Sequence, residues 1–237
     1  MLGSIFASAM NCFAARYAAG ESWLRGRSHC DSCGHELGFL DLVPVFSYIF
    51  LKGRCRYCHT KMSPRYLITE IILGSIFVIT YLRVGLTLRL IRNLILFVIL
   101  FAISLIDYDT YEIPDGLVLG GAIVWLIFAV ILKENLWKGL LGGIILGGSI
   151  LIISLILDKI LNKESLGGGD IKLLAMVGLY SGPILGILLL FVASVVGLIF
   201  IGIGKTNKIP FGPAISIATV FTVLFGEQLL QLYLMLF

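Results

Sequence analysis

Long apolar runs, each about the length of a membrane-crossing helix, constrain this chain more than any other feature. A helix needs roughly 20 apolar residues to cross a hydrocarbon core about 30 Å thick. Eight candidate runs follow one another: residues 1–19, 66–82, 88–106, 116–132, 138–157, 171–181, 182–204 and 209–237. Because 59% of the 237 residues are hydrophobic and only 14% are charged, the sequence predicts an all-α polytopic protein with about eight transmembrane helices in membrane lipid.

The basic residues predict which ends of these helices face the cytoplasm. Eight of them flank or lie within one long polar loop: Arg16, Arg25, Arg27, Lys52, Arg54, Arg56, Lys61 and Arg65. The positive-inside rule places this loop in the cytoplasm. With eight spans, the loops at 107–115, 158–170 and 205–208 face the same side. Three arginines between 83 and 92 fall on the opposite face and are the weak point of this orientation.

The chain divides into three parts on this pattern. Residues 1–19 form a first transmembrane helix, which we expect to be retained because no basic residue precedes its apolar core. Residues 20–65 form a small cytoplasmic insert, and residues 66–237 form a bundle of seven further helices. The net charge of +4 follows membrane topology, so we expect no nucleic-acid partner.

Four cysteines in the insert predict a structural zinc site. Cys30 and Cys33 form one CxxC pair, Cys55 and Cys58 form another, and 21 residues lie between the two pairs. Two thiolates on one tight turn can occupy adjacent corners of a tetrahedron, and two such turns complete a closed four-thiolate site. Disulfides, a redox role and spare cysteines are the alternatives. The cytoplasmic assignment disfavours disulfides, since the cytosol is reducing.

Carboxylates gather where apolar helices meet loops on the predicted cytoplasmic side. Asp107, Asp109, Glu112 and Asp115 follow the run that ends at residue 106. Asp170 follows three glycines and precedes another apolar run. Acids at the membrane edge are costly and are therefore functional candidates. Asp107 and Asp170 lie nearest to apolar helix, so we expect these two to carry the chemistry and the other three acids to be solvated loop or cap residues. The alternative for Asp170 is a helix N-cap.

Two aspartates brought within a few ångströms of each other can divide one proton between them. The ionised carboxylate can then activate water while the protonated one serves as an acid, which neither achieves alone. The neighbouring glycines let the extended backbone of a substrate approach closely. This pattern predicts a membrane aspartyl protease.

Five segments, in the same order, resemble the bacterial type IV prepilin peptidases, a family of GxGD aspartyl proteases. They are Ser8-x-x-Asn11 with Arg16, the insert from Cys30 to Cys58 with Ser63-Pro64-Arg65-Tyr66 after it, Asp107 with Ile113-Pro114-Asp115, Gly167-x-Gly169-Asp170, and Ile209-Pro210-Phe211-Gly212-Pro213. In the family's first catalytic motif the acid lies seven residues before the proline. On that register the catalytic residues are Asp107, and not Asp109, together with Asp170.

The resemblance implies a bacterial multi-pass protein of the inner (plasma) membrane, with its active site facing the cytoplasm. It implies cleavage of prepilins or pseudopilins after the glycine that ends a short basic leader. It also implies N-methylation of the new amino terminus with S-adenosylmethionine, although the sequence shows no cofactor motif for that activity.

Two other functions compete with this prediction. An ion-coupled transporter is suggested by acids within helices, Glu70 and Glu227 among them. A zinc-stabilised membrane scaffold without catalysis is the other alternative.

Overall fold

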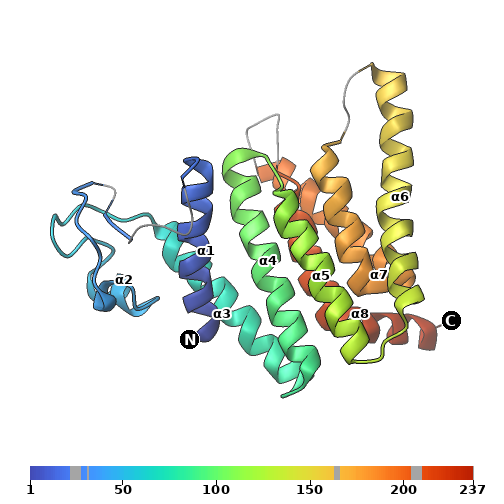
Figure 1. The fold of residues 1–237 in the computed structure, drawn as a ribbon, viewed down its shortest axis with the longest axis horizontal. Helices are drawn as coiled ribbons and strands as arrows, with labels where there is room; N and C mark the ends of the chain where they lie inside the picture. The colour runs from blue at the N-terminus through green and yellow to red at the C-terminus, as the bar shows by residue number, and fades with distance from the viewer. Residues whose placement is uncertain (22–27, 31, 163–165, 204–209, 237) are drawn as a thin grey trace. The chain divides into compact units, whose positions relative to one another are not determined.

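The computed structural model describes residues 1–237 except 22–27, 31, 163–165, 204–209 and 237 (Figure 1). All the regular secondary-structure elements in these ranges are helices, which confirms the predicted all-α class. The helices are α1 (Leu2–Ala18), the 3-10 helix η1 (Phe39–Asp41), α2 (Phe46–Phe50), α3 (Pro64–Val84), α4 (Leu88–Thr110), α5 (Asp115–Ile131), α6 (Leu136–Leu161), α7 (Gly168–Ile203) and α8 (Gly212–Leu236).

The described chain forms two compact units, Met1–Gly85 and Leu86–Phe237. The first unit holds α1, the four-cysteine insert and α3, and the second holds α4 to α8. The predicted division at residues 19 and 65 remains a prediction.

In the first unit, small residues let α1 and α3 approach closely. A Cβ added to Gly3 would lie 2.7 Å from the carbonyl oxygen of Leu73, so no larger residue fits there. The buried Asn11 amide donates a hydrogen bond of 2.8 Å to the Thr69 hydroxyl on α3. In lipid, such close packing and polar contacts hold helices together, because lipid tails are as apolar as leucine.

In the second unit, glycines on α6 meet glycines on α7. A Cβ added to Gly142 would lie 2.3 Å from the carbonyl oxygen of Gly178 and 2.5 Å from the Cα of Gly182. The Gly142-Gly143 pair of the sequence is therefore a helix-packing feature.

Gly182 breaks α7 into two arms. Its φ of 68° and ψ of −178° are not helical, and Pro183 follows it. On the first arm Ala175 contacts Gly147 and Gly178 contacts Gly142, whereas on the second arm Gly186 contacts Leu146. The second arm therefore runs back along α6. With α7 counted as two arms, the described helices match all eight predicted runs.

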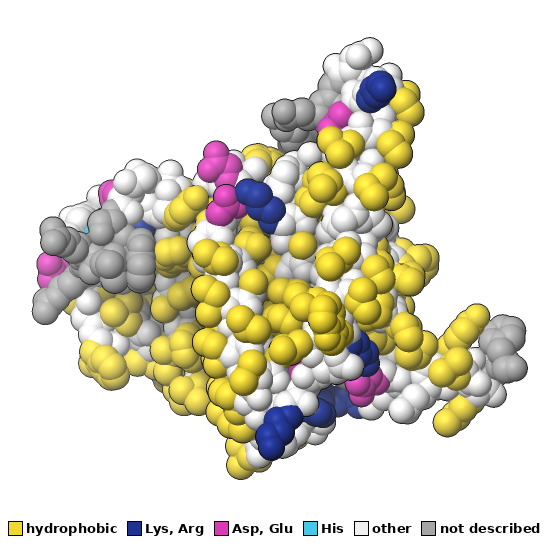
Figure 2. All heavy atoms as spheres, turned by 45° about the vertical axis from the view of Figure 1, so that its right-hand side comes forward, with side chains coloured by type: hydrophobic (Ala, Val, Ile, Leu, Met, Phe, Trp, Pro, Cys, Tyr) yellow, Lys and Arg dark blue, Asp and Glu magenta, His cyan; other side chains and the backbone are white. Residues whose placement is uncertain are grey.

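Five of the described helices are long and apolar enough to cross a membrane, α7 counting as one of them. They are α3, α4, α6, α7 and α8, and α5 is a shorter apolar helix. Hydrophobic side chains cover much of the face seen in Figure 2, while charged side chains gather near the ends of the helices. This distribution is what a polytopic membrane protein requires, since its outer surface contacts lipid.

Candidate active site and metal centre

Asp107 lies in the last helical turns of α4 and is buried, with 5% of its surface exposed. Its Oδ2 accepts a hydrogen bond of 2.7 Å from the backbone N–H of Gly212, the first residue of α8. A Cβ added to Gly212 would also lie 2.7 Å from this oxygen. The N-terminus of α8 therefore reaches Asp107 because residue 212 has no side chain.

Asp170 lies in the first turn of α7 and is partly buried. Its Oδ1 is shielded from solvent and has no hydrogen-bond partner among the described residues. Buried polar atoms without a partner are uncommon and point to a functional or occupied site. The helix begins at Gly168, two residues earlier, so the N-cap alternative for Asp170 is wrong.

The structure brings the two predicted acids to the same end of the second unit. Figure 1 shows that the end of α4 and the beginning of α7 lie at this end. The carboxyl groups of Asp107 and Asp170 are near enough to interact electrostatically. Because the two acids are 63 positions apart in the sequence, only the packing of α4 to α8 creates the pair.

The glycines before Asp170 have different surroundings. A Cβ added to Gly169 would lie 2.9 Å from the Cβ of Ile113, in the segment between α4 and α5. At Gly168, no atom of the described residues lies within 4 Å of that position. Gly169 thus permits close packing, whereas Gly168 leaves open space two residues from the acid.

The remaining acids of this region are exposed, as predicted. Asp109 and Glu112 are at the surface. Asp115 begins α5 and pairs with Lys172 on α7 at 2.8 Å, with 71% and 56% of the two side chains exposed. Such exposed pairs contribute about 0–1 kcal/mol. Sequence analysis did not predict this pair, although both residues adjoin the proposed motifs. Glu227, suggested for a transporter, is exposed on α8.

The four cysteines of the first unit form a cluster with the geometry of a metal site. Their sulfur atoms all lie within 4.8 Å of one another. The Sγ atoms of Cys30 and Cys58 are 3.8 Å apart. A tetrahedral zinc with bonds of about 2.3 Å needs sulfurs about 3.8 Å apart, so the donor set fits zinc.

Two similar turns build this cluster. The N–H groups of Cys30 and Cys55 donate to the carbonyls of His35 and Thr60, five residues further on in each turn. Gly34 and His59 take positive φ angles of 68° and 58° at matching places after the second cysteine. Both turns therefore place a residue in the left-handed region directly after the CxxC pair.

The environments of the thiols also favour a bound cation. Contacts with the hydroxyl and backbone of Thr60 lower the pKa of Cys58 to about 6. The backbone of His35 favours the Cys33 thiolate, but desolvation and the neighbouring thiols outweigh it and raise the pKa of Cys33 to about 11. Four thiolates this close need a positive charge among them, which zinc supplies.

Two family models match the chain. One is described as the bacterial peptidase A24 N-terminal domain and matches residues 1–84. The other is described as the type IV leader peptidase family and matches residues 94–202.

Curated relatives cover most of the chain. A prepilin leader peptidase/N-methyltransferase of Dichelobacter nodosus is 33% identical over 212 residues, which are 87% of this chain and 73% of the relative. A protein of the same description from Aeromonas hydrophila is 32% identical over 88% of this chain and 74% of its own length. The type 4 prepilin-like proteins leader peptide-processing enzyme of Escherichia coli O78:H11 is 34% identical over 83% of this chain and 75% of its own. No solved structure matches the chain.

Proposed function

This chain belongs to the type IV leader peptidase family, and we propose that Asp107 and Asp170 are the two catalytic residues of its aspartic peptidase activity. The substrates are type IV prepilins or pseudopilins, cleaved at the cytoplasmic face of the bacterial inner membrane. One observation carries the proposal above all. Asp170 holds a buried carboxyl oxygen without a described partner, at the end of the unit where Asp107 is buried.

Peptide hydrolysis follows from one proton that is shared by the two carboxyl groups. The ionised carboxylate takes a proton from water while the water oxygen bonds to the scissile carbonyl carbon. The protonated carboxyl group gives its proton to the substrate, and the departing nitrogen is protonated as the C–N bond breaks. The Gly212 N–H holds one oxygen of Asp107, so the orientation of this carboxyl group is fixed before the substrate binds.

The space beside Gly168 suits an unwound substrate. A helix hides its scissile carbonyl groups, so the leader junction must be extended when it reaches the acids. Open space at Gly168, two residues from Asp170, allows such a backbone to pass closely.

The proposed metal ligands are Cys30, Cys33, Cys55 and Cys58, holding one zinc ion. A site with four protein ligands has no open position, so zinc here stabilises the fold of the insert and takes no part in hydrolysis. The two CxxC turns that would close the zinc site lie in a part of the chain where η1 and α2 are the only described helices.

The second proposed activity is N-methylation of the amino terminus released by cleavage, as the descriptions of the relatives suggest. S-adenosylmethionine would supply the methyl group, with transfer of the methyl carbon from sulfur to the amine nitrogen and loss of a proton from that nitrogen.

The test of the proposed peptidase is cleavage of a prepilin by the full chain in detergent or proteoliposomes. Asp107→Asn and Asp170→Asn should each lower the cleavage rate by at least about 1,000-fold, because the pair acts as a unit. Asp109→Asn is the matched control, since this acid lies two residues from Asp107 but is exposed. Cleavage at the wild-type rate by either pair variant would refute the proposal.

A further inference from the structure

A short segment of the four-cysteine insert, residues 39–50, exposes only apolar side chains. It holds η1, a turn and α2, and all of its residues are described. Its exposed residues are Phe39, Leu40, Leu42, Phe46, Ile49 and Phe50, and 86% of Phe39 and 81% of Phe50 are exposed. Proteins in water rarely leave large apolar side chains gathered in this way, so this surface needs an apolar partner.

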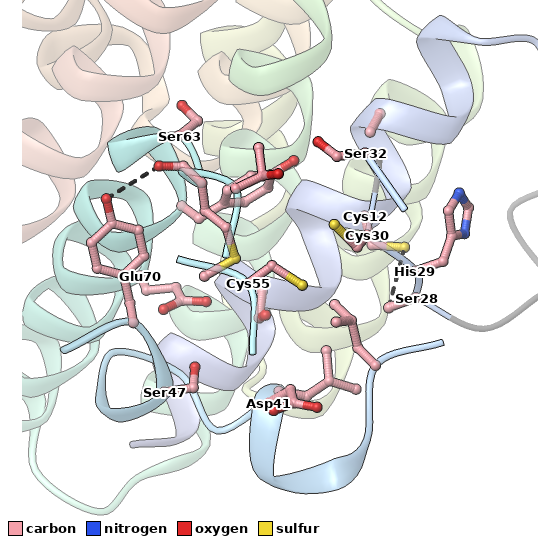
Figure 3. A pocket seen from close by; sticks show the side chains of 18 of the residues that line it. Cys12, Ser28, His29, Cys30, Ser32, Asp41, Ser47, Cys55, Ser63 and Glu70 are labelled. Atoms are coloured by element: carbon pink, nitrogen blue, oxygen red, sulfur yellow. Dashed lines mark hydrogen bonds between the residues drawn. The ribbon is translucent and has the colours of Figure 1, made fainter. Parts of the chain in front are cut away.

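The polar side chains of the same segment turn inward. Asp41 and Ser47 line a cavity of about 430 Å³ inside the first unit, as Figure 3 shows, and Tyr48 lines it too. Asp41 also pairs with Arg56, and only 5% of its side chain is exposed. The segment is therefore amphipathic, and its apolar side faces away from the protein.

A hydrogen bond from Val45 to Glu70 sets the depth of the segment along α3. This helix is long and apolar enough to cross a membrane, and it begins at Pro64. Glu70 lies six residues later, about 9 Å along the axis at 1.5 Å per residue. Its Oε2 accepts a hydrogen bond of 2.7 Å from the N–H of Val45. Val45 is therefore held beside the second turn of α3 and not beside its end.

The chain comes back to the start of α3 directly after α2. The N–H of Met62, two residues before Pro64, donates a hydrogen bond of 2.8 Å to the carbonyl of Gly53. Figure 1 shows α2 at the level of α1 and α3 and not beyond their ends. Lys52 and Arg54 are exposed where the chain comes back. The segment thus forms a loop that descends beside α3, with basic residues next to the start of that helix.

The backbone of the loop is suited to lipid. Lipid offers no hydrogen bonds, so an irregular backbone at membrane depth needs partners within the protein. Four N–H groups donate to carbonyls of the segment itself, those of Phe46, Ser47, Ile49 and Leu51. Pro44 has no N–H, and the Glu70 carboxylate accepts the N–H of Val45. A carboxylate in an apolar helix is costly to keep, and this contact gives Glu70 a reason to be there.

We propose that residues 39–50 insert into the bilayer as a re-entrant element, with Phe39 and Phe50 in contact with lipid acyl chains. The proposal divides the predicted cytoplasmic insert into a cysteine cluster in water and a segment in the adjoining membrane leaflet. It rests on the membrane-spanning helices and not on the catalytic pair.

The apolar surface of the segment continues the lipid-facing surface of α3. Ile68, Ile71 and Ile72 are exposed on α3 at the level of Glu70, the residue that holds the segment. The same lipid can therefore cover both surfaces. Lys52 and Arg54 lie where the negative phosphates of the lipid headgroups would meet them.

Tryptophan fluorescence of the full chain in proteoliposomes tests this depth. Phe39→Trp and Phe50→Trp keep an aromatic side chain at two exposed positions. Lipids brominated at mid-chain should quench at least about half of the fluorescence that each variant adds to the wild type, because each ring would lie within a leaflet about 15 Å deep. Iodide dissolved in the water should quench little of it.

Tyr57→Trp is the matched control. This aromatic residue belongs to the same insert, is 46% exposed and lies outside the segment, within the second CxxC turn. Its added fluorescence should be quenched by iodide and not by brominated lipid. The three native tryptophans are present in every protein compared, so the wild-type signal is subtracted.

The two quenchers together distinguish lipid from other surroundings. Quenching of Phe39→Trp and Phe50→Trp by iodide and not by lipid would place the segment in water and overturn the proposal. Shielding from both quenchers would mean that another protein chain covers the segment, which would also overturn it. Phe39 and Phe50 lie on separate helices, so a folding defect in one variant leaves the other informative.

Discussion

At Gly212, the absence of a side chain decides how α8 meets the proposed catalytic pair. The hydrogen bond from its N–H to buried Asp107 is of the kind that contributes about 1.5–3 kcal/mol when the carboxyl group is ionised. The exposed pair between Asp115 and Lys172 is worth about 0–1 kcal/mol. The buried contact is therefore the stronger constraint on the site.

Gly212→Ala should reduce prepilin cleavage by about 100-fold, because its Cβ would lie 2.7 Å from Asp107 Oδ2 and would displace the carboxyl group. Initial rates with a purified prepilin measure the effect. Gly120→Ala is the control, since no described atom lies within 4 Å of its Cβ position. Equal rates for the two variants would show that Gly212 does not position Asp107.

Among the elements, α6 contacts the two arms of α7 through glycines, which have no side chain to keep the backbones apart. Gly142 and Gly178 bring the two helix backbones together, and Gly182 lets α7 reverse. Asp170 stands at the free end of the first arm, so the position of this arm on α6 sets the position of the acid.

Gly142→Ala should destabilise the protein by about 1–3 kcal/mol, because a methyl group has no room between the backbones. Thermal unfolding in detergent, followed by circular dichroism, would measure this change. Gly148→Ala lies six residues along the same helix, where the nearest described atom is 4.0 Å away. We expect this second variant to be neutral or slightly stabilised. The opposite order would contradict the packing described for α6 and α7.

The insert is the element that we expect to depend on a metal ion. It is built largely of turns, so we expect one zinc ion per chain to hold it together. Cys55→Ser should lose the metal and lower the melting temperature, as measured by elemental analysis and thermal unfolding. Cys12→Ser removes a cysteine outside the cluster and should retain the zinc. A metal-free wild-type chain with unchanged stability would refute the site.

For the whole molecule, charge and hydropathy predict the orientation in the bilayer. The opposite-face arginines, the weak point of the positive-inside pattern, are partly explained by the structure. Arg89 and Arg92 both pair with Glu134, at 3.6 and 2.6 Å. Paired arginines carry less net charge to that face, so they oppose the predicted orientation less than their number suggests.

Reporter fusions test that orientation. Alkaline phosphatase fused after Asn162, between α6 and α7, should be inactive because we predict that this end faces the cytoplasm. The same reporter fused after Lys133, between α5 and α6, should be active. A fluorescent protein that matures in the cytoplasm should give the reverse pattern. Phosphatase activity after Asn162 would place the aspartates on the wrong side.

The sequence by itself determined the features that depend only on residues close together along the chain. Apolar runs long enough to span lipid predicted the helices, and even the division of α7 between residues 181 and 182. Two CxxC pairs predicted the cysteine cluster, because ligands on one tight turn are close by construction. Acids at the ends of apolar runs identified Asp107 and Asp170 as candidates.

Only the tertiary structure decided which of these features meet. The contacts from Gly212 to Asp107, from Val45 to Glu70 and from Lys172 to Asp115 each join residues at least 25 positions apart. Inside lipid, hydrophobicity does not select which helix faces pair. Small residues and single polar contacts make that choice. Whether two helix faces fit depends on the residues of both helices, so no local pattern along the chain specifies which faces pair.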